Sequence, residues 1–302
     1  MANSIAGEAL YQWKQWAIQR AQSNDVDVYE VEWLLQGLTP LTHLSIRLDS
    51  YREQSNVWCE LSLAQLTEKW QQRVINRVPV QYIAGKTPWR NFSITVSPDV
   101  LIPRPETELM IDIAEGLITQ SPIADQCDSG DWADLGTGSG AIALGLAYCF
   151  PKATIHAIDI SPSTLDIAKR NARQNHLAHR IIFYQGSWLS PLQAHIKGKL
   201  TGIVSNPPYI PSNVIATLQP EVTNHEPHLA LDGGSDGLDC IKHLIEISHH
   251  YLNSGGIWLT ELMAGQAETV EDLLKQHDSY THINIHPDLS GIDRFVSARK
   301  AL

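Results

Sequence analysis

The second half of the chain alternates strand-like and helix-like segments, and this pattern limits the fold more than any other feature. Hydrophobic periodicity predicts helices near 140–149, 163–176 and 238–252, between strands near 132–136, 154–159, 181–185, 201–206 and 257–262. Such alternation implies an α/β fold whose parallel sheet is covered on both faces. Two last strands, near 281–286 and 294–299, flank a turn and predict an antiparallel hairpin at the edge of the sheet.

The front of the chain, residues 1–77, has helical periodicity and few strand signals. Leu10, Trp13 and Ala17 recur at helical spacing on a helix expected to start near Ala6. Segments that begin at Asp27 and Ser62 resemble capping boxes and predict helix starts. Five of the nine tryptophans lie here, and they fill the core of a small bundle or form a docking surface: Trp13, Trp16, Trp33, Trp58 and Trp70.

Residues 78–100 differ from both neighbouring regions because prolines separate short β-like runs. The runs at 80–83 and 92–96 flank Gly85 and predict a β-hairpin. A length of 302 residues suggests about two domains. We therefore expect a helical substrate-docking domain over 1–77, a hairpin linker over 78–100 and a catalytic domain over 101–302.

Charge and cysteine content limit the partners and the compartment. Lys and Arg number 22 against 33 Asp and Glu, a net charge of −11, without a Lys/Arg-rich run. A protein that neutralises many phosphates carries a basic face, so duplex nucleic acid is a poor candidate substrate. The four cysteines form no CxxC pair, and we expect neither a metal site nor disulfides. No signal peptide or membrane span is expected, and the predicted location is the cytoplasm.

A glycine-rich turn follows the first strand of the alternating region. Asp134 ends this predicted strand, and the turn before the next helix reads Gly136, Thr137, Gly138, Ser139, Gly140. Glycine lets the backbone approach a ligand closely, and a helix N-terminus offers N–H groups to an anion. Dinucleotide-binding folds use a similar turn, but Ala141 occupies its sixth position, so the fingerprint is met only in its tolerant form. S-adenosylmethionine fits this turn better than NAD.

Two more candidates follow the next two strands. Asp159 lies 19 residues after Gly140, where an acid at a strand end binds ribose hydroxyls in related folds. Its alternative role is a simple helix N-cap. Trp188 lies after the third strand, at the edge of the sheet where ligands bind, and is a candidate for stacking on adenine, with core packing as the alternative.

The fourth strand leads directly into Asn206-Pro207-Pro208-Tyr209. The Asn206 side-chain carbonyl can accept one N–H of a planar NH2 group, and the Pro207 carbonyl can accept the other. The prolines stiffen this clamp, and Tyr209 can stack on the target. We interpret Asn206, Pro207 and Tyr209 as catalytic, because the clamp aims the nitrogen lone pair at a sulfonium methyl. The motif holds a glutamine amide or the amine of adenine or cytosine equally well, and a merely rigid loop is a further alternative.

Several segments together resemble the PrmC/HemK family of release factor glutamine methyltransferases. They lie at 101–108, 134–140, 186–188, 205–210, 226–227 and 233–238, within a resemblance that spans about 79–299. The resemblance implies a class I S-adenosylmethionine-dependent methyltransferase, Rossmann-like, with a seven-stranded sheet behind a small helical domain. It also implies methyl transfer to the side-chain amide nitrogen (N5) of the glutamine in the Gly-Gly-Gln motif of class 1 peptide chain release factors.

The resemblance also assigns roles to residues. It implies S-adenosylmethionine contacts at 136–140, Asp159, Trp188 and Asn206, with Asn206, Pro207, Pro208 and Tyr209 holding the glutamine. The segment around Arg104 would close one wall of the pocket, or serve only as a linker. The stretch 261–266 departs from the family, which usually has a glycine soon after the acidic residue that corresponds to Glu261. We expect this departure to alter local packing. The alternative function is DNA or RNA adenine N6-methylation, which the acidic charge and the lack of a recognisable target-recognition domain disfavour.

Overall fold

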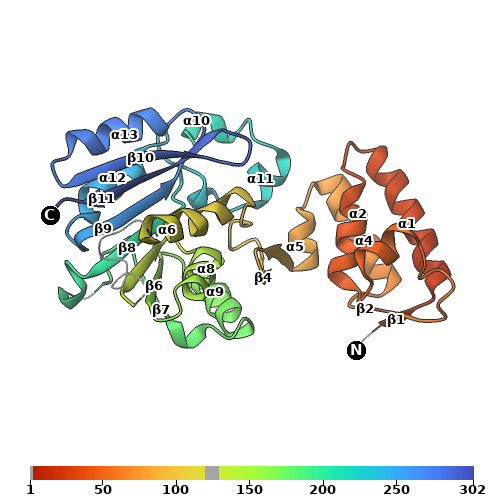
Figure 1. Ribbon diagram of the computed structural model, residues 1–302. Coiled ribbons are helices and arrows are strands. Elements are labelled where there is room, and N and C mark those ends of the chain that lie inside the picture. Colours follow the sequence, from red (N-terminus) through yellow and green to blue (C-terminus); the bar gives the residue numbers. More distant parts are fainter. Residues whose placement is uncertain (1–2, 120–128, 193) are drawn as a thin grey trace. The chain divides into compact units, whose positions relative to one another are not determined.

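The computed structural model describes residues 3–119, 129–192 and 194–302, which excludes Cys127. The chain divides into two compact units (Figure 1). The first contains Met1–Thr87 with Gln219–His225, and the second contains Pro88–Leu218 with Glu226–Leu302. Within the described ranges, no helix has the length and apolar character needed to cross a membrane.

The first unit is a small helical bundle with one pair of short strands. Its elements are β1 Asn3–Ile5, α1 Gly7–Gln22, α2 Tyr29–Leu38, α3 His43–Arg47, β2 Val57–Cys59, α4 Leu63–Asn76, α5 Val80–Ala84 and α11 Pro220–His225. Trp13 and Trp70 fill its core, with ring centroids 6.4 Å apart. The core-packing interpretation is confirmed for these two residues, whereas Trp58 on β2 is 45% exposed.

One local prediction for this unit succeeds and two fail. Ser62 and Gln65 form the expected capping box of α4. The box predicted at Asp27 is wrong, because Arg73 pairs with the carboxylate of Glu30, which therefore does not reach back to the helix start. The β-run predicted at 80–83 is also wrong, because these residues form α5. A hairpin is present but shorter, with β3 Lys86–Trp89 and β4 Phe92–Thr95 joined through Arg90, whose φ is 48°.

The second unit contains a seven-stranded sheet in the order β10-β11-β9-β8-β5-β6-β7. The strands are β5 Asp131–Leu135, β6 Thr154–Asp159, β7 Ile181–Gln185, β8 Leu200–Ser205, β9 Leu252–Glu261, β10 Tyr280–Pro287 and β11 Asp293–Lys300. Strands β5 to β9 pair in parallel, and β11 joins β9 and β10 antiparallel. The predicted class I methyltransferase sheet with an antiparallel C-terminal hairpin is confirmed.

Helices cover both faces of this sheet (Figure 1). Helices α12 Asp239–Ser248 and α13 Ala267–Gln276 pack on one face, whereas α6 Leu109–Thr119, α8 Ala141–Cys149 and α9 Pro162–Gln174 pack on the other. Short 3-10 helices lie at Glu106–Glu108 (η1), Ala178–Arg180 (η2), Ala194–Ile196 (η3) and His228–Ala230 (η4), and a short α10 at Ser212–Ile215. Helix α13 was not predicted from the sequence.

Close packing in the middle of the sheet needs a glycine. Gly202 on β8 lies beside the fully buried ring of Trp132 on β5, and a Cβ at Gly202 would come within 2.2 Å of that ring. Trp132 in turn stacks on Phe150, with ring centroids 4.9 Å apart. This packing sets β8 tightly against β5, so that the residues after both strands meet at one edge of the sheet.

Candidate functional site

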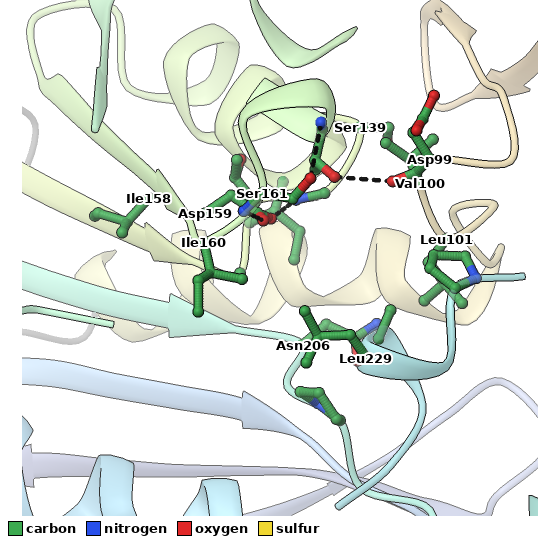
Figure 2. A pocket seen from close by; sticks show the side chains of 18 of the residues that line it. Asp99, Val100, Leu101, Ser139, Ile158, Asp159, Ile160, Ser161, Asn206 and Leu229 are labelled. Carbon is green, nitrogen blue, oxygen red and sulfur yellow. Dashed lines mark hydrogen bonds between the residues drawn. The ribbon is translucent and has the colours of Figure 1, made fainter. Parts of the chain in front are cut away.

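A pocket of about 490 Å³ lies at the carboxyl ends of β5, β6 and β8, which is a volume typical of small-molecule sites. Most of its lining comes from four segments, at 98–103, 136–142, 158–164 and 186–188. Thr107, Asn206, Pro208 and Cys240, with residues from 227 to 232, complete the wall. Figure 2 shows these groups around the pocket: Ser139, Asp159 and Ser161 on one side, Asp99 and Leu101 on a second, and Asn206 and Leu229 on a third.

The glycine turn after β5 adopts the backbone geometry that its glycines allow. Gly136, Gly138 and Gly140 have φ values of 72°, 55° and 83°, which other residues rarely adopt. The N–H groups of Gly136 and Thr137 both donate to the Ile158 carbonyl at 2.9 Å, which ties the turn to β6. A Cβ at Gly136 would lie 3.7 Å from the Trp188 ring, so the turn and the indole line the pocket together.

The Asp134 carboxylate supports this turn through hydrogen bonds. It lies within β5, one residue before the observed strand end, and its side chain is fully buried. Its Oδ2 atom accepts hydrogen bonds from Thr137 Oγ1 at 2.6 Å and from the Ala143 N–H at 2.9 Å. Burial raises its pKa to about 7. Its Oδ1 atom has no hydrogen-bond partner among the described residues, so Asp134 positions the turn at a cost in desolvation.

Asp159 ends β6 as predicted and lines the pocket. Its Oδ2 accepts from the Gly138 N–H and its Oδ1 from the Ser161 N–H, each at 3.0 Å. Burial raises the pKa of this carboxyl group. The N-cap of α9 is Ser161, whose hydroxyl accepts from the Thr164 N–H, so the N-cap interpretation of Asp159 is wrong.

The loop after β8 is held by a chain of polar side chains. Asn206 Nδ2 donates to Thr107 Oγ1 at 3.2 Å, and Thr107 Oγ1 donates to Glu261 Oε2 at 2.7 Å. The Tyr209 hydroxyl donates to the other oxygen of Glu261 at 3.0 Å. Glu261 is only 1% exposed. Burial raises its pKa, and the two hydroxyl donors together with the positive charge of Arg294 oppose that rise.

Glycines also let a neighbouring loop press against this segment. A Cβ at Gly233 would come within 2.8 Å of the Pro208 carbonyl, and one at Gly237 within 2.3 Å of the Tyr209 carbonyl. The Gln266 side chain donates to the same Tyr209 carbonyl at 3.0 Å. The backbone of Pro208 and Tyr209 is therefore held between the 233–237 loop and the residues that follow β9.

Arg104 does not line the pocket but forms an ion pair with Glu226. Its Nη2 atom donates to both carboxylate oxygens of Glu226, at 2.9 and 2.8 Å. The Glu226 side chain is 1% exposed, and burial raises its pKa while the Arg104 guanidinium opposes the rise. This ion pair fastens the segment before Thr107 to the segment before Leu229, and both segments contribute to the pocket wall.

The structure thus brings most of the predicted residues to one pocket. Its lining includes Asp159, Trp188 and the members of the glycine turn 136–139, together with Asn206 and Pro208. The lining does not include Gly140, Pro207, Tyr209 or Arg104, although each of them follows a lining residue directly in the sequence. Within the described ranges, no group of three or more His, Cys, Asp and Glu side chains is arranged to hold a metal ion.

Three residues that support the acceptor loop were not predicted from the sequence: Thr107, Glu261 and Gln266. Glu261 ends an apolar run, and a carboxylate is almost never fully buried unless it is paired, so its position was a usable signal. Thr107 lies in the segment 101–108 that resembles the family, but neither it nor Gln266 carried a signal of its own. The stretch 261–266, expected only to alter local packing, instead contacts Tyr209 through both its first and its last residue.

Comparisons with known proteins agree with the fold and identify the family. The sequence model of the methyltransferase small domain matches residues 109–234. A release factor glutamine methyltransferase from Synechocystis sp. is 49% identical over 98% of this chain and 97% of that protein. One from Thermosynechococcus vestitus is 44% identical over 98% of this chain and 99% of that protein. A methyltransferase structure from Pyrococcus furiosus, 15% identical, covers 79% of this chain and 98% of its own, with a TM-score of 0.51, which shows the fold alone.

Proposed function

Because the chain belongs to the release factor glutamine methyltransferase family, we propose that it methylates the side-chain amide nitrogen (N5) of a release factor glutamine. The glutamine is the one in the Gly-Gly-Gln motif of class 1 peptide chain release factors. The observation that carries this function is the placement of Asn206 on the same pocket as the glycine turn and Asp159. A donor site and an acceptor site thereby open into one cavity.

The donor half of the pocket fits S-adenosylmethionine. When bound, this molecule supplies a methyl group on a positively charged sulfur. The glycine turn lets backbone lie against the ligand, and Asp159 offers carboxylate oxygens at the strand end where ribose hydroxyls bind in related folds. Trp188, which lines the pocket beside Gly136, offers an aromatic face for adenine.

The acceptor half holds the NH2 group of the glutamine. Asn206 Oδ1 accepts one N–H, and the Pro207 carbonyl accepts the other. An amide nitrogen is a weak nucleophile because its lone pair is delocalised into the carbonyl group. Two fixed acceptors favour a pyramidal nitrogen with its lone pair directed at the methyl carbon, so catalysis depends on orientation and electrostatics.

The transfer needs no dedicated general base. The nitrogen lone pair forms the new N–C bond while the C–S bond breaks and its electrons remain on sulfur. The product nitrogen is then cationic and acidic, and its proton passes to water after the transfer. Asn206 and Pro207 stabilise the developing positive charge on nitrogen, because each presents a carbonyl oxygen to an N–H that becomes more polar.

Among its residues from Asn3 onward, the first unit supplies no comparable set of chemical groups, and we assign it to docking of the release factor. Its core is filled by Trp13 and Trp70, whereas Trp58 keeps 45% of its surface exposed. An exposed tryptophan is a typical anchor in protein interfaces. Replacement of Trp58 by alanine should raise KM for the release factor and leave the affinity for S-adenosylmethionine unchanged.

One assay separates this function from adenine methylation. The purified protein is incubated with labelled S-adenosylmethionine and either a release factor, DNA or RNA, and the label is located by mass spectrometry. We expect label on the Gly-Gly-Gln glutamine, and none when that glutamine is replaced. Label on adenine, or on no substrate at all, would contradict the proposed function.

A further inference from the structure

We infer that Glu261 and Thr107 are positioning residues that fix which end of the Asn206 amide faces the substrate. The inference rests on the proposed function and concerns the same site. The three side chains come from separate elements: Thr107 from η1, Asn206 from the loop after β8, and Glu261 from the end of β9. They meet only in the folded unit.

Glu261 sets the direction of the hydrogen bonds. An ionised carboxylate can only accept hydrogen bonds. Its two oxygens accept from Thr107 Oγ1 at 2.7 Å and from the Tyr209 hydroxyl at 3.0 Å. Burial raises the pKa of Glu261 and Glu106 on η1 adds to that rise, whereas the two hydroxyl donors and the charge of Arg294 on β11 favour the ionised form. Each hydroxyl therefore directs its single hydrogen towards Glu261.

The direction of the next hydrogen bond follows from this one. Thr107 Oγ1 has given its only hydrogen to Glu261, so it can only accept from Asn206, 3.2 Å away. The Asn206 amide must then present its NH2 end to Thr107. Its carbonyl oxygen is left for a donor in the pocket that Asn206 lines. The target NH2 group of glutamine is such a donor.

Without this chain of bonds, the amide could turn over. An asparagine that rotates by half a turn presents an NH2 group to the NH2 group of the substrate, and two donors cannot bond to each other. The same carboxylate also holds Tyr209, so Glu261 fixes both ends of Asn206-Pro207-Pro208-Tyr209. Its position at the end of β9, next to β8, allows it to reach both.

The test compares two substitutions of one residue. Thr107→Val keeps the branched shape of the side chain and removes the hydroxyl, whereas Thr107→Ser keeps the hydroxyl and removes the methyl group. We expect kcat to fall by about 10- to 100-fold in Thr107→Val, because Asn206 loses its fixed acceptor. Thr107→Ser should recover most of that loss. A role in packing alone predicts the reverse order.

Glu261→Gln tests the origin of the chain. The glutamine is almost isosteric, but its NH2 end must donate to one of the two hydroxyls, which reverses one bond. We expect kcat to fall by about 10- to 100-fold in this variant as well. In the double variant Glu261→Gln/Thr107→Val the two losses should be far from additive, because both act through Asn206. Thr201→Val, a buried substitution of the same kind on β8, is the matched control.

Dissociation constants for S-adenosylmethionine and thermal unfolding are measured for every variant. The inference requires that both stay near the wild-type values while kcat falls. It is wrong if Thr107→Val keeps wild-type kcat, or if kcat falls only in proportion to donor affinity or stability. If the wild-type enzyme methylates no release factor, the proposed function fails instead, so the two failures are distinguishable.

Discussion

The loops after β5 and β8 start from neighbouring parallel strands and are held by the same chemistry. In each, a threonine hydroxyl donates to a buried carboxylate: Thr137 to Asp134 in the donor loop, and Thr107 to Glu261 beside the acceptor loop. The distances along the chain differ greatly. Asp134 and Thr137 are 3 residues apart, whereas Thr107 and Glu261 are 154 residues apart.

This difference separates a local structure from a long-range one. The donor loop is held by segments close to it in the sequence, because Asp134 bonds to Thr137 and Ala143, and the next strand, β6, supplies the Ile158 carbonyl and the Asp159 carboxylate. The acceptor loop needs η1, β8 and β9 together. We therefore expect the donor loop to tolerate distant changes, whereas the acceptor loop should respond to changes in any of its three elements.

The largest effect is expected from the acceptor loop itself. Asn206→Ala removes one of the two acceptors for the glutamine NH2 group, and kcat should fall by about 100- to 1,000-fold. The affinity for S-adenosylmethionine should change little. Single-turnover kinetics and calorimetry measure the two quantities separately. Asn284→Ala, an exposed asparagine on β10, is the control, and unaltered turnover in Asn206→Ala would refute the clamp.

A smaller effect, on the affinity for S-adenosylmethionine rather than on kcat, is expected in the donor loop. Asp159→Ala removes a carboxylate that contacts the turn through Gly138 and faces the pocket. The dissociation constant for S-adenosylmethionine should rise by about 10- to 100-fold, while kcat at saturating donor falls much less. Asp166→Ala on the exposed face of α9 is the matched control. A loss confined to kcat would show that Asp159 serves the acceptor side.

The smallest effect concerns stability and pH. The pKa of Asp134 is raised from 3.8 to about 7 in the folded protein, so its contribution to stability is present below 3.8 and is lost as pH rises to about 7. Asp134→Asn cannot ionise. As the pH rises between these values, the free energy of unfolding of Asp134→Asn should increase relative to that of the wild type. The increase should reach about 1–3 kcal/mol near pH 7.

Urea unfolding at pH 5 and pH 8 checks this prediction. Asp166→Asn, an exposed substitution of the same kind on α9, is the matched control. If Asp134→Asn has the same pH dependence as the wild type, Asp134 does not take up a proton on folding in this range. The desolvation cost assigned to the buried Asp134 carboxylate is then wrong.

The same contrast explains what could be predicted from the sequence. The seven strands, the glycine turn and the placement of Asp159 follow from periodicity and from spacing within one βαβ unit, which are local properties. Tyr209 illustrates the limit. Its sequence context indicated stacking on the substrate, whereas the structure bonds its hydroxyl to Glu261 on another strand. Stacking by Tyr209 stays a prediction.

Two local errors have a similar origin. The sequence at 80–83 has strand-forming residues, but Val80 and Ala84 pack into the helical bundle as part of α5. At Glu30, a capping role was predicted from spacing, but a buried arginine from α4 pairs with its carboxylate. In both cases tertiary contacts decided between local alternatives that the sequence left close in energy.

A crossed measurement on the two threonines tests this account most directly. Thr137→Val and Thr107→Val remove the same atom from the two carboxylate contacts, and each variant is assayed for donor affinity and for kcat with a release factor. We predict that Thr137→Val weakens S-adenosylmethionine binding by about 10-fold with kcat nearly retained, and that Thr107→Val lowers kcat with binding retained. Equal losses of both quantities in both variants would contradict the separation of the two loops.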